Sequence, residues 1–224
     1  MTHTLRLNCA CLFLLAIHAQ AQVHWAKTFG GAIDGYAGHG LVLAVSDDSS
    51  IYATGGFQGT TDAGGNSLTA NSTGSDVLVL KLNSGGEVLW AKAFGGTAFM
   101  YDWEYGRHVA VDELHDQIVV GGEIHTLFTL DTIVFNGLTT STGGNAFLAC
   151  FDEDGNVRWG RAIKCSSGFT SLLDMHVSNT GVTYGFGYLT CQTQAPGSVP
   201  QTIGPGGFIA VSYTHLTLPT KRIV

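Results

Sequence analysis

One short segment of the chain combines aromatic rings with carboxylates. The sequence MYDWEY at positions 100–105 sets three rings beside two acids: Tyr101, Trp103, Tyr105, Asp102 and Glu104. Flat rings stack on sugars and on apolar protein surfaces, and carboxylates accept hydrogen bonds from hydroxyl groups. These five residues therefore predict a contact site for a glycan or a protein. The alternative is that the rings only cover a junction between structural units.

The other reactive side chains do not form a pattern typical of catalysis. The 9 histidines lack the spacing of a metal site or of a Ser-His pair. The segment 152–156 (DEDGN) resembles a calcium loop, because acidic oxygens alternate along it. The matching segment 83–87 (NSGGE) has far fewer carboxylates, which favours a hairpin turn at both places. The sequence predicts no enzyme, no cofactor and no metal.

Composition indicates strands joined by tight turns. Among 224 residues, 31 are glycine, 4 are proline and only 12% are charged, whereas 45% are hydrophobic. This balance predicts an all-β protein rather than one of long charged helices. The net charge of −7 and the absence of a basic stripe in the sequence argue against nucleic acid or anionic lipid as partners.

The first residues have the features of an export signal. Arg6 precedes an apolar run at positions 7–17, and small residues lead up to Ala21. This pattern predicts a signal peptide at 1–21 that is cut after Ala21. The run is shorter than the roughly 20 residues that a spanning helix needs. We therefore expect a secreted or cell-surface protein without a membrane span after cleavage.

Three cysteines follow the predicted signal: Cys150, Cys165 and Cys191. An oxidising compartment permits one disulfide among them, and the sequence leaves the pairing open. None has the spacing of a zinc site.

The chain contains an internal repeat. The sequence WAKTFGG at 25–31 returns as WAKAFGG at 90–96 and, more loosely, as WGRAIKC at 159–165. The spacings are 65 and 69 residues. One large aromatic at the same place in each unit predicts a packing role between neighbouring units, for Trp25, Trp90 and Trp159.

Four strands are predicted in each unit. Two short apolar strands flank a polar turn, as at 43–56 and 109–122 and more loosely at 175–187. A hairpin follows, at 76–90 (DVLVLKLNSGGEVLW) and at 145–159 (NAFLACFDEDGNVRW). Repeated units of four antiparallel strands are typical of β-propeller blades, of which the chain would hold about two and a half.

These motifs carry a resemblance to a known family. The WAKxFGG segments, the AVSDDSSIYATGGF segment at 44–57 and the hairpin at 76–90 resemble the bacterial β-propeller repeat family called SBBP. The resemblance covers roughly Trp25 to Val211 and implies that 22–211 is a partial propeller from an exported or surface protein. It says little about activity.

The repeat fails near the end of the chain. A fourth-strand tryptophan is expected at 220, where Thr220 stands, and Pro219 lies inside the expected strand. The segment 212–224 (SYTHLTLPTKRIV) resembles translated sequencing-adapter read-through, so we predict a non-native tail. Because a closed propeller takes about four to eight blades, we also expect a longer parent protein.

Three functional hypotheses remain open. The first is a structural or adhesive surface protein that binds a glycan or a protein without turnover. The second is part of a quinoprotein-like propeller enzyme, although adjacent cysteines and an acid set for calcium are not evident. The third is a spacer for a downstream catalytic or sorting domain.

Overall fold

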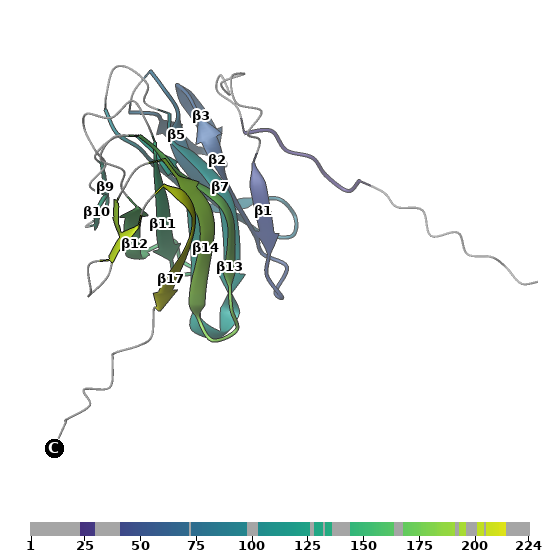
Figure 1. The fold of residues 1–224 in the computed structure, drawn as a ribbon. Helices are drawn as coiled ribbons and strands as arrows, with labels where there is room; N and C mark the ends of the chain where they lie inside the picture. The colour runs from purple at the N-terminus through teal and green to yellow at the C-terminus, as the bar shows by residue number, and fades with distance from the viewer. Residues whose placement is uncertain are drawn as a thin grey trace, which may run out of the picture.

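The computed structural model describes residues 23–29, 41–71, 73–97, 103–125, 128–131, 133–135, 144–163, 168–190, 193–195, 201–203 and 205–213. Within these ranges the chain consists of β-strands, with one short 3-10 helix, η1 (Glu113–His115) (Figure 1). The named strands all pair antiparallel. The prediction of an all-β protein is confirmed.

Three sheets account for most of the strands. Sheet I has the order β1-β2-β5-β6 and contains β1 (Val42–Val45), β2 (Ile51–Phe57), β5 (Asp76–Leu82) and β6 (Val88–Phe94). Sheet II repeats this order with β7 (Tyr105–Asp112), β8 (Gln117–Ile124), β11 (Asn145–Phe151) and β12 (Val157–Ile163). Sheet III contains β13 (Thr170–Val177), β14 (Val182–Leu189) and β17 (Gly206–Tyr213).

Each sheet carries a small hairpin between its second and third strands. These hairpins are β3 (Thr60–Ala63) with β4 (Asn66–Thr69), β9 (Phe128–Leu130) with β10 (Ile133–Phe135), and β15 (Thr193–Ala195) with β16 (Gln201–Ile203). The sequence predicts only a polar loop at this place in the repeat. Strands this short carry too little hydrophobic alternation to stand out from a loop.

The third and fourth strands of sheets I and II are joined by similar turns. Gly86 and Gly155 have φ angles of 79° and 83°, in the left-handed region that favours glycine. Gly155 N donates to Asp152 O at 3.0 Å, and Asp152 Oδ1 accepts from Asn156 N at 2.7 Å. The acidic segment 152–156 is therefore a hairpin turn, and one carboxylate oxygen of Asp152 accepts hydrogen bonds from that turn's own backbone.

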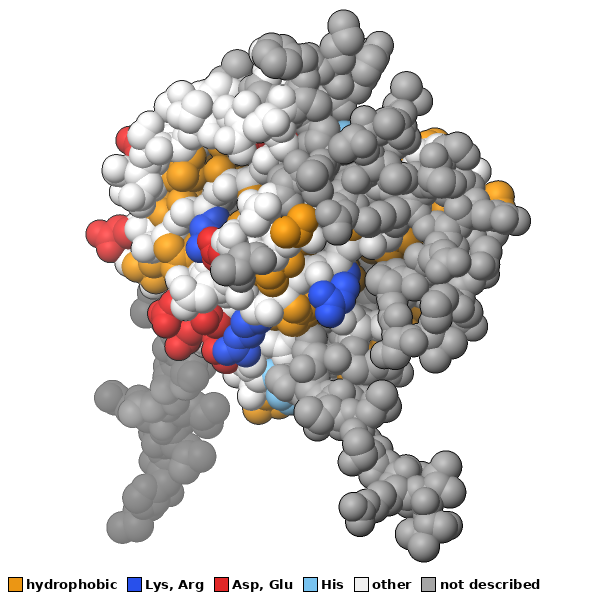
Figure 2. All heavy atoms as spheres, turned by 90° about the vertical axis from the view of Figure 1, so that its left-hand side faces the viewer, with side chains coloured by type: hydrophobic (Ala, Val, Ile, Leu, Met, Phe, Trp, Pro, Cys, Tyr) orange, Lys and Arg blue, Asp and Glu red, His pale blue; other side chains and the backbone are white. Residues whose placement is uncertain are grey.

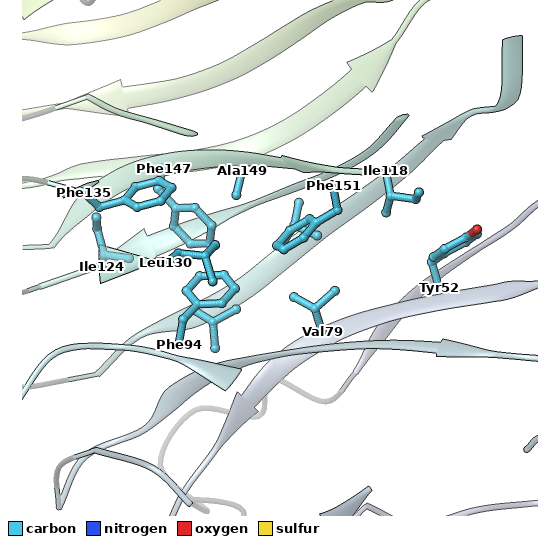
Figure 3. Close-up of a cluster of buried hydrophobic side chains, with 12 residues drawn as sticks. Tyr52, Val79, Phe94, Ile118, Ile124, Leu130, Phe135, Phe147, Ala149 and Phe151 are labelled. Atoms are coloured by element: carbon cyan, nitrogen blue, oxygen red, sulfur yellow. The ribbon is translucent and has the colours of Figure 1, made fainter. Parts of the chain in front are cut away.

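Sheets I and II pack through a cluster rich in aromatic rings. Phe147 meets Phe94 edge to face at 5.8 Å and Phe135 at 6.1 Å between ring centroids. Figure 3 shows these rings between the two sheets, with Tyr52 at one end of the cluster. Edge-to-face contacts of this kind add to the stability gained from burial alone.

Sheets II and III pack through a second cluster. Val119, Leu148 and Cys150 come from sheet II, and Leu172 and Phe208 come from sheet III. All five side chains are buried. In both clusters, alternate residues of a strand of sheet II face sheet I or sheet III, as the side-chain period of a strand requires.

Two predicted boundaries fall largely on residues that the structure leaves undescribed. The predicted signal peptide, 1–21, lies outside the described ranges, as do residues 214–224 of the predicted tail. Ser212 and Tyr213 belong to β17, where they pair with Thr183 and Val182.

Candidate functional site

The predicted contact segment lies where β5 begins. Tyr101 and Asp102 fall outside the described residues. Trp103 forms an isolated parallel bridge with Ser75, and Glu104 N donates to Ser75 O at 2.8 Å. The backbone of this segment is therefore attached to sheet I just before sheet II starts.

Glu104 and Tyr105 are buried, with 0% and 6% of their surface exposed. Glu104 Oε2 accepts from Gly96 N at 3.2 Å. A Cβ at Gly95 would lie 2.6 Å from Glu104 Oε2 and 2.5 Å from Asp76 Oδ1, so two buried carboxylates approach this glycine. Glu104 and Tyr105 therefore support the junction of sheets I and II. Trp103 is half-buried and is the most accessible of the three described residues of the segment.

Two of the repeated tryptophans dock on the hairpin turn of the following sheet. Trp25 Nε1 donates to Ser84 O at 3.0 Å, and Trp90 Nε1 donates to Glu153 O at 2.8 Å. In each case the acceptor lies two residues before the turn glycine, and a Cβ on that glycine would lie 3.0 Å from the indole ring. We call this contact the tryptophan clasp.

The clasp at Trp90 includes further side chains from sheets I and II. The Trp90 ring lies 6.3 Å from that of Tyr52 and 6.4 Å from that of Phe151. Lys81 Nζ donates to the same Glu153 O at 3.1 Å and lies 5.4 Å from the Tyr52 ring centroid. Burial raises the pKa of Tyr52, and Lys81 opposes that rise.

Removing the indole N–H tests the clasp. We expect Trp90→Phe to cost about 1 kcal/mol of unfolding free energy, since one hydrogen bond is lost while most of the ring stays. The matched control is Trp159→Phe, because the buried Trp159 Nε1 has no hydrogen-bond partner among the described residues. Urea unfolding compares the two variants. Equal losses would show that the N–H contributes nothing.

A cavity lies near the clasp, at the turn end of sheets I and II. Its volume is about 270 Å³, and its polar lining includes Ser46, Asp48, Asp112, Glu113, Asp116 and Glu153. Ile51 pairs with Leu82 and Phe57 with Asp76, so this end of sheet I is opposite to the end that carries Trp103. We call this cavity the acidic pocket.

Three connections are joined to one another around the acidic pocket. Asp47 N donates to the carboxylate of Glu113, which links the β1–β2 turn to η1. Asp116 Oδ1 accepts from Glu153 N at 2.8 Å, and the other Asp116 oxygen pairs with Arg158. These contacts hold the pocket wall without using the side chain of Glu153.

The carboxylate of Asp48 is held in its charged form. The Ser46 hydroxyl donates to it, and the Ser50 backbone N–H and hydroxyl donate at 2.8 and 2.9 Å. These hydrogen bonds lower the pKa of Asp48. An ionised, oriented carboxylate accepts strong hydrogen bonds from hydroxyl groups.

Sequence reasoning missed the acidic pocket. Its residues come from 46–52, 111–118 and 153, which are far apart along the chain. Of these segments, the sequence singles out only the turn at 152–156, which resembles a calcium loop. Within the described ranges, no group of three or more His, Cys, Asp or Glu residues is arranged to hold a metal ion.

Figure 2 shows both acidic and basic side chains on the coloured part of one face. The blue Lys and Arg groups there are separate rather than forming one stripe, and some lie beside red carboxylates. Ion pairs in the fold include Lys92 with Asp131 at 3.4 Å and Arg107 with Glu123 at 3.1 Å.

Cys150 is a free, buried thiol, whereas Cys165 and Cys191 lie outside the described residues. Burial raises the pKa of Cys150 to about 12. Because the thiolate is the reactive form, we expect alkylation of Cys150 at pH 8 to require unfolding. Mass spectrometry of the Cys150 peptide, with and without denaturant, checks this. Equal labelling in both samples would contradict it.

Comparison with known proteins does not assign the chain to a family. No protein-family model matches the chain, and no curated protein matches it. In the part of the chain that the structure describes, no helix has the length and apolar character needed to cross a membrane. The candidate contact residues are those of the acidic pocket and of the segment around Trp103.

Proposed function

We propose that the chain is a secreted or cell-surface repeat protein with a binding role rather than a catalytic one. Its sheets would be successive blades of a β-propeller, as the SBBP-like motifs imply. The acidic pocket would be its contact site, and the ligand would be a hydroxyl-rich glycan. The segment 101–105 is a second contact region in this proposal, through Trp103.

The convergence of carboxylates on one cavity carries the proposal. The five acids that line it come from the β1–β2 turn, the connection containing η1 and the β11–β12 turn. Sugar hydroxyls donate hydrogen bonds to such groups, and each charge-assisted bond contributes about 1.5–3 kcal/mol. The repeated sheets support the propeller, because each packs in the same way on the next.

A glycan array probed with the full chain tests the pocket. We expect Glu153→Ala to weaken glycan binding about tenfold, since one charged acceptor is removed. The control is Asp154→Ala, from the same turn but outside the pocket lining. Equal binding by both variants would exclude Glu153. Binding of simple amines that falls with salt, without binding of glycans, would identify a cation site instead.

Trp103→Ala tests the second region on the same array. We expect weaker binding of any glycan that stacks on the ring. Binding equal to that of the unmodified chain would exclude Trp103 and leave the segment as a sheet junction.

A further inference from the structure

Polar side chains connect sheets II and III beside their shared hydrophobic cluster. The Ser171 hydroxyl of β13 donates to Glu123 of β8, and the Arg107 guanidinium pairs with the other Glu123 oxygen at 3.1 Å. His108 of β7 contacts the backbone of β13, with 3.4 Å between its Nε2 and Leu172 O. Leu172 itself is buried in the cluster. This junction therefore includes a side chain, His108, of the type that titrates near neutral pH.

Irregular strand pairing places His108 at the junction. The register of β7 on β8 shifts between Gly106 and His108, and that of β13 on β14 shifts between Leu172 and Asp174. A bulge of this kind bends its strand and re-aims a side chain. The two bulges meet at the contact between His108 and Leu172 O.

The contact with Leu172 O decides which ring nitrogen of His108 takes up a proton. A carbonyl oxygen only accepts, so the neutral ring carries its hydrogen on Nε2, facing Leu172 O. Acid then adds a proton to Nδ1. The positive charge that results would lie on a side chain that is half-buried between two sheets.

Burial is the largest influence on the pKa of His108, and it lowers that pKa. The hydrogen bond to Leu172 O and the charge of Asp174 on β13 act in the opposite direction, whereas the charge of Arg107 acts with burial. Asp174 is exposed, so water screens its attraction for the ring. The neutral form of His108 is therefore favoured.

The other charged groups described on the strands around His108 do not reverse this balance. Glu123 of β8 is already in an ion pair. Asp112, at the far end of β7, is paired with His115. His176 of β13 is exposed, and β1, which also lies against β7, consists of apolar residues.

We propose that His108 is an acid-sensitive contact between sheets II and III, which loosens when its ring takes up a proton. A histidine whose folded-state pKa lies below its unfolded value of about 6.5 contributes less to stability as the pH falls. The contact should be complete above about pH 7 and weaken below about pH 6.5. It goes beyond the binding role, because sheets I and II form the acidic pocket.

Hydrogen exchange of the full chain at pH 7.5 and at pH 5.5 tests the proposal, after correction for the intrinsic effect of pH on exchange. We expect amides of β13 and β14 to exchange about threefold faster or more at pH 5.5, and amides of β2 and β5 to change less. His108→Gln keeps a hydrogen-bond donor without the titrating ring and should abolish this difference. The matched control is His176→Gln, which should retain it because His176 is exposed.

An NMR titration of the His108 ring in the unmodified chain provides a second measurement that needs no substitution. Its midpoint should lie below about pH 6.5. A midpoint above that value would overturn the proposal. An acid effect of equal size in sheets I and III would also overturn it, as would an effect that persists in His108→Gln.

Discussion

Replacing Gly122 with alanine is expected to destabilise the fold by about 3 kcal/mol or more, the upper range for overpacking a core. Gly122 lies in β8 opposite Gly106 of β7. A Cβ there would lie 1.8 Å from Tyr105 O and 2.9 Å from a ring carbon of Phe147. The backbone carbonyl cannot rotate away as a side chain can, so the strands of sheet II would have to separate. Urea unfolding followed by circular dichroism measures the loss.

Gly207→Ala is the matched control for Gly122→Ala. Gly207 also lies in a strand, β17, but its Cβ would meet only Gly187 O, at 3.8 Å, which is an ordinary contact. We expect its unfolding free energy to change by about 0.5 kcal/mol or less. Gly187→Ala should resemble Gly122→Ala, because its Cβ would lie 2.1 Å from Ser171 O. Similar losses at Gly207 and Gly122 would contradict the steric argument.

Phe147→Ala is expected to cost about 3–5 kcal/mol, the range found for buried phenylalanine. Phe147 is 1% exposed and makes edge-to-face contacts with Phe94 of sheet I and Phe135 of the β9–β10 hairpin. Its removal leaves a cavity where these three elements meet. Since whole domains are stable by only about 5–15 kcal/mol, this loss would remove a large share of the total. Thermal and urea unfolding both measure it.

The control for Phe147→Ala is Phe186→Ala in β14 of sheet III. Phe186 is 48% exposed, so its truncation should cost at most about 1 kcal/mol at a concentration where the chain is monomeric. A loss at Phe186 as large as that at Phe147 would contradict the argument that burial determines the cost of removing a ring.

The repeated motifs were sufficient to predict the strands of the three sheets. The alternation of apolar and polar residues and turn residues such as Gly86 and Gly155 are local properties of the chain. They can therefore be recognised from the sequence alone. The small hairpins were not predicted, because their strands of three or four residues give a weak signal. The buried position of Glu104 was also not evident. A carboxylate beside aromatic rings predicts an exposed contact site unless its packing partners are known.

The sequence by itself determined the all-β class, the approximate positions of the longer strands in each unit and the repetition of tryptophan. Only the tertiary structure decided where the side chains of distant units meet. The indole of Trp90 finds its acceptor at Glu153, and Asp48, Glu113 and Glu153 converge on one pocket. The physical reason is that hydrophobic periodicity specifies which face of a strand is buried but not which sheet buries it. The packing of sheet I on sheet II placed these acids around one cavity. In sheet III it left apolar side chains such as Phe186 and Ile209 exposed.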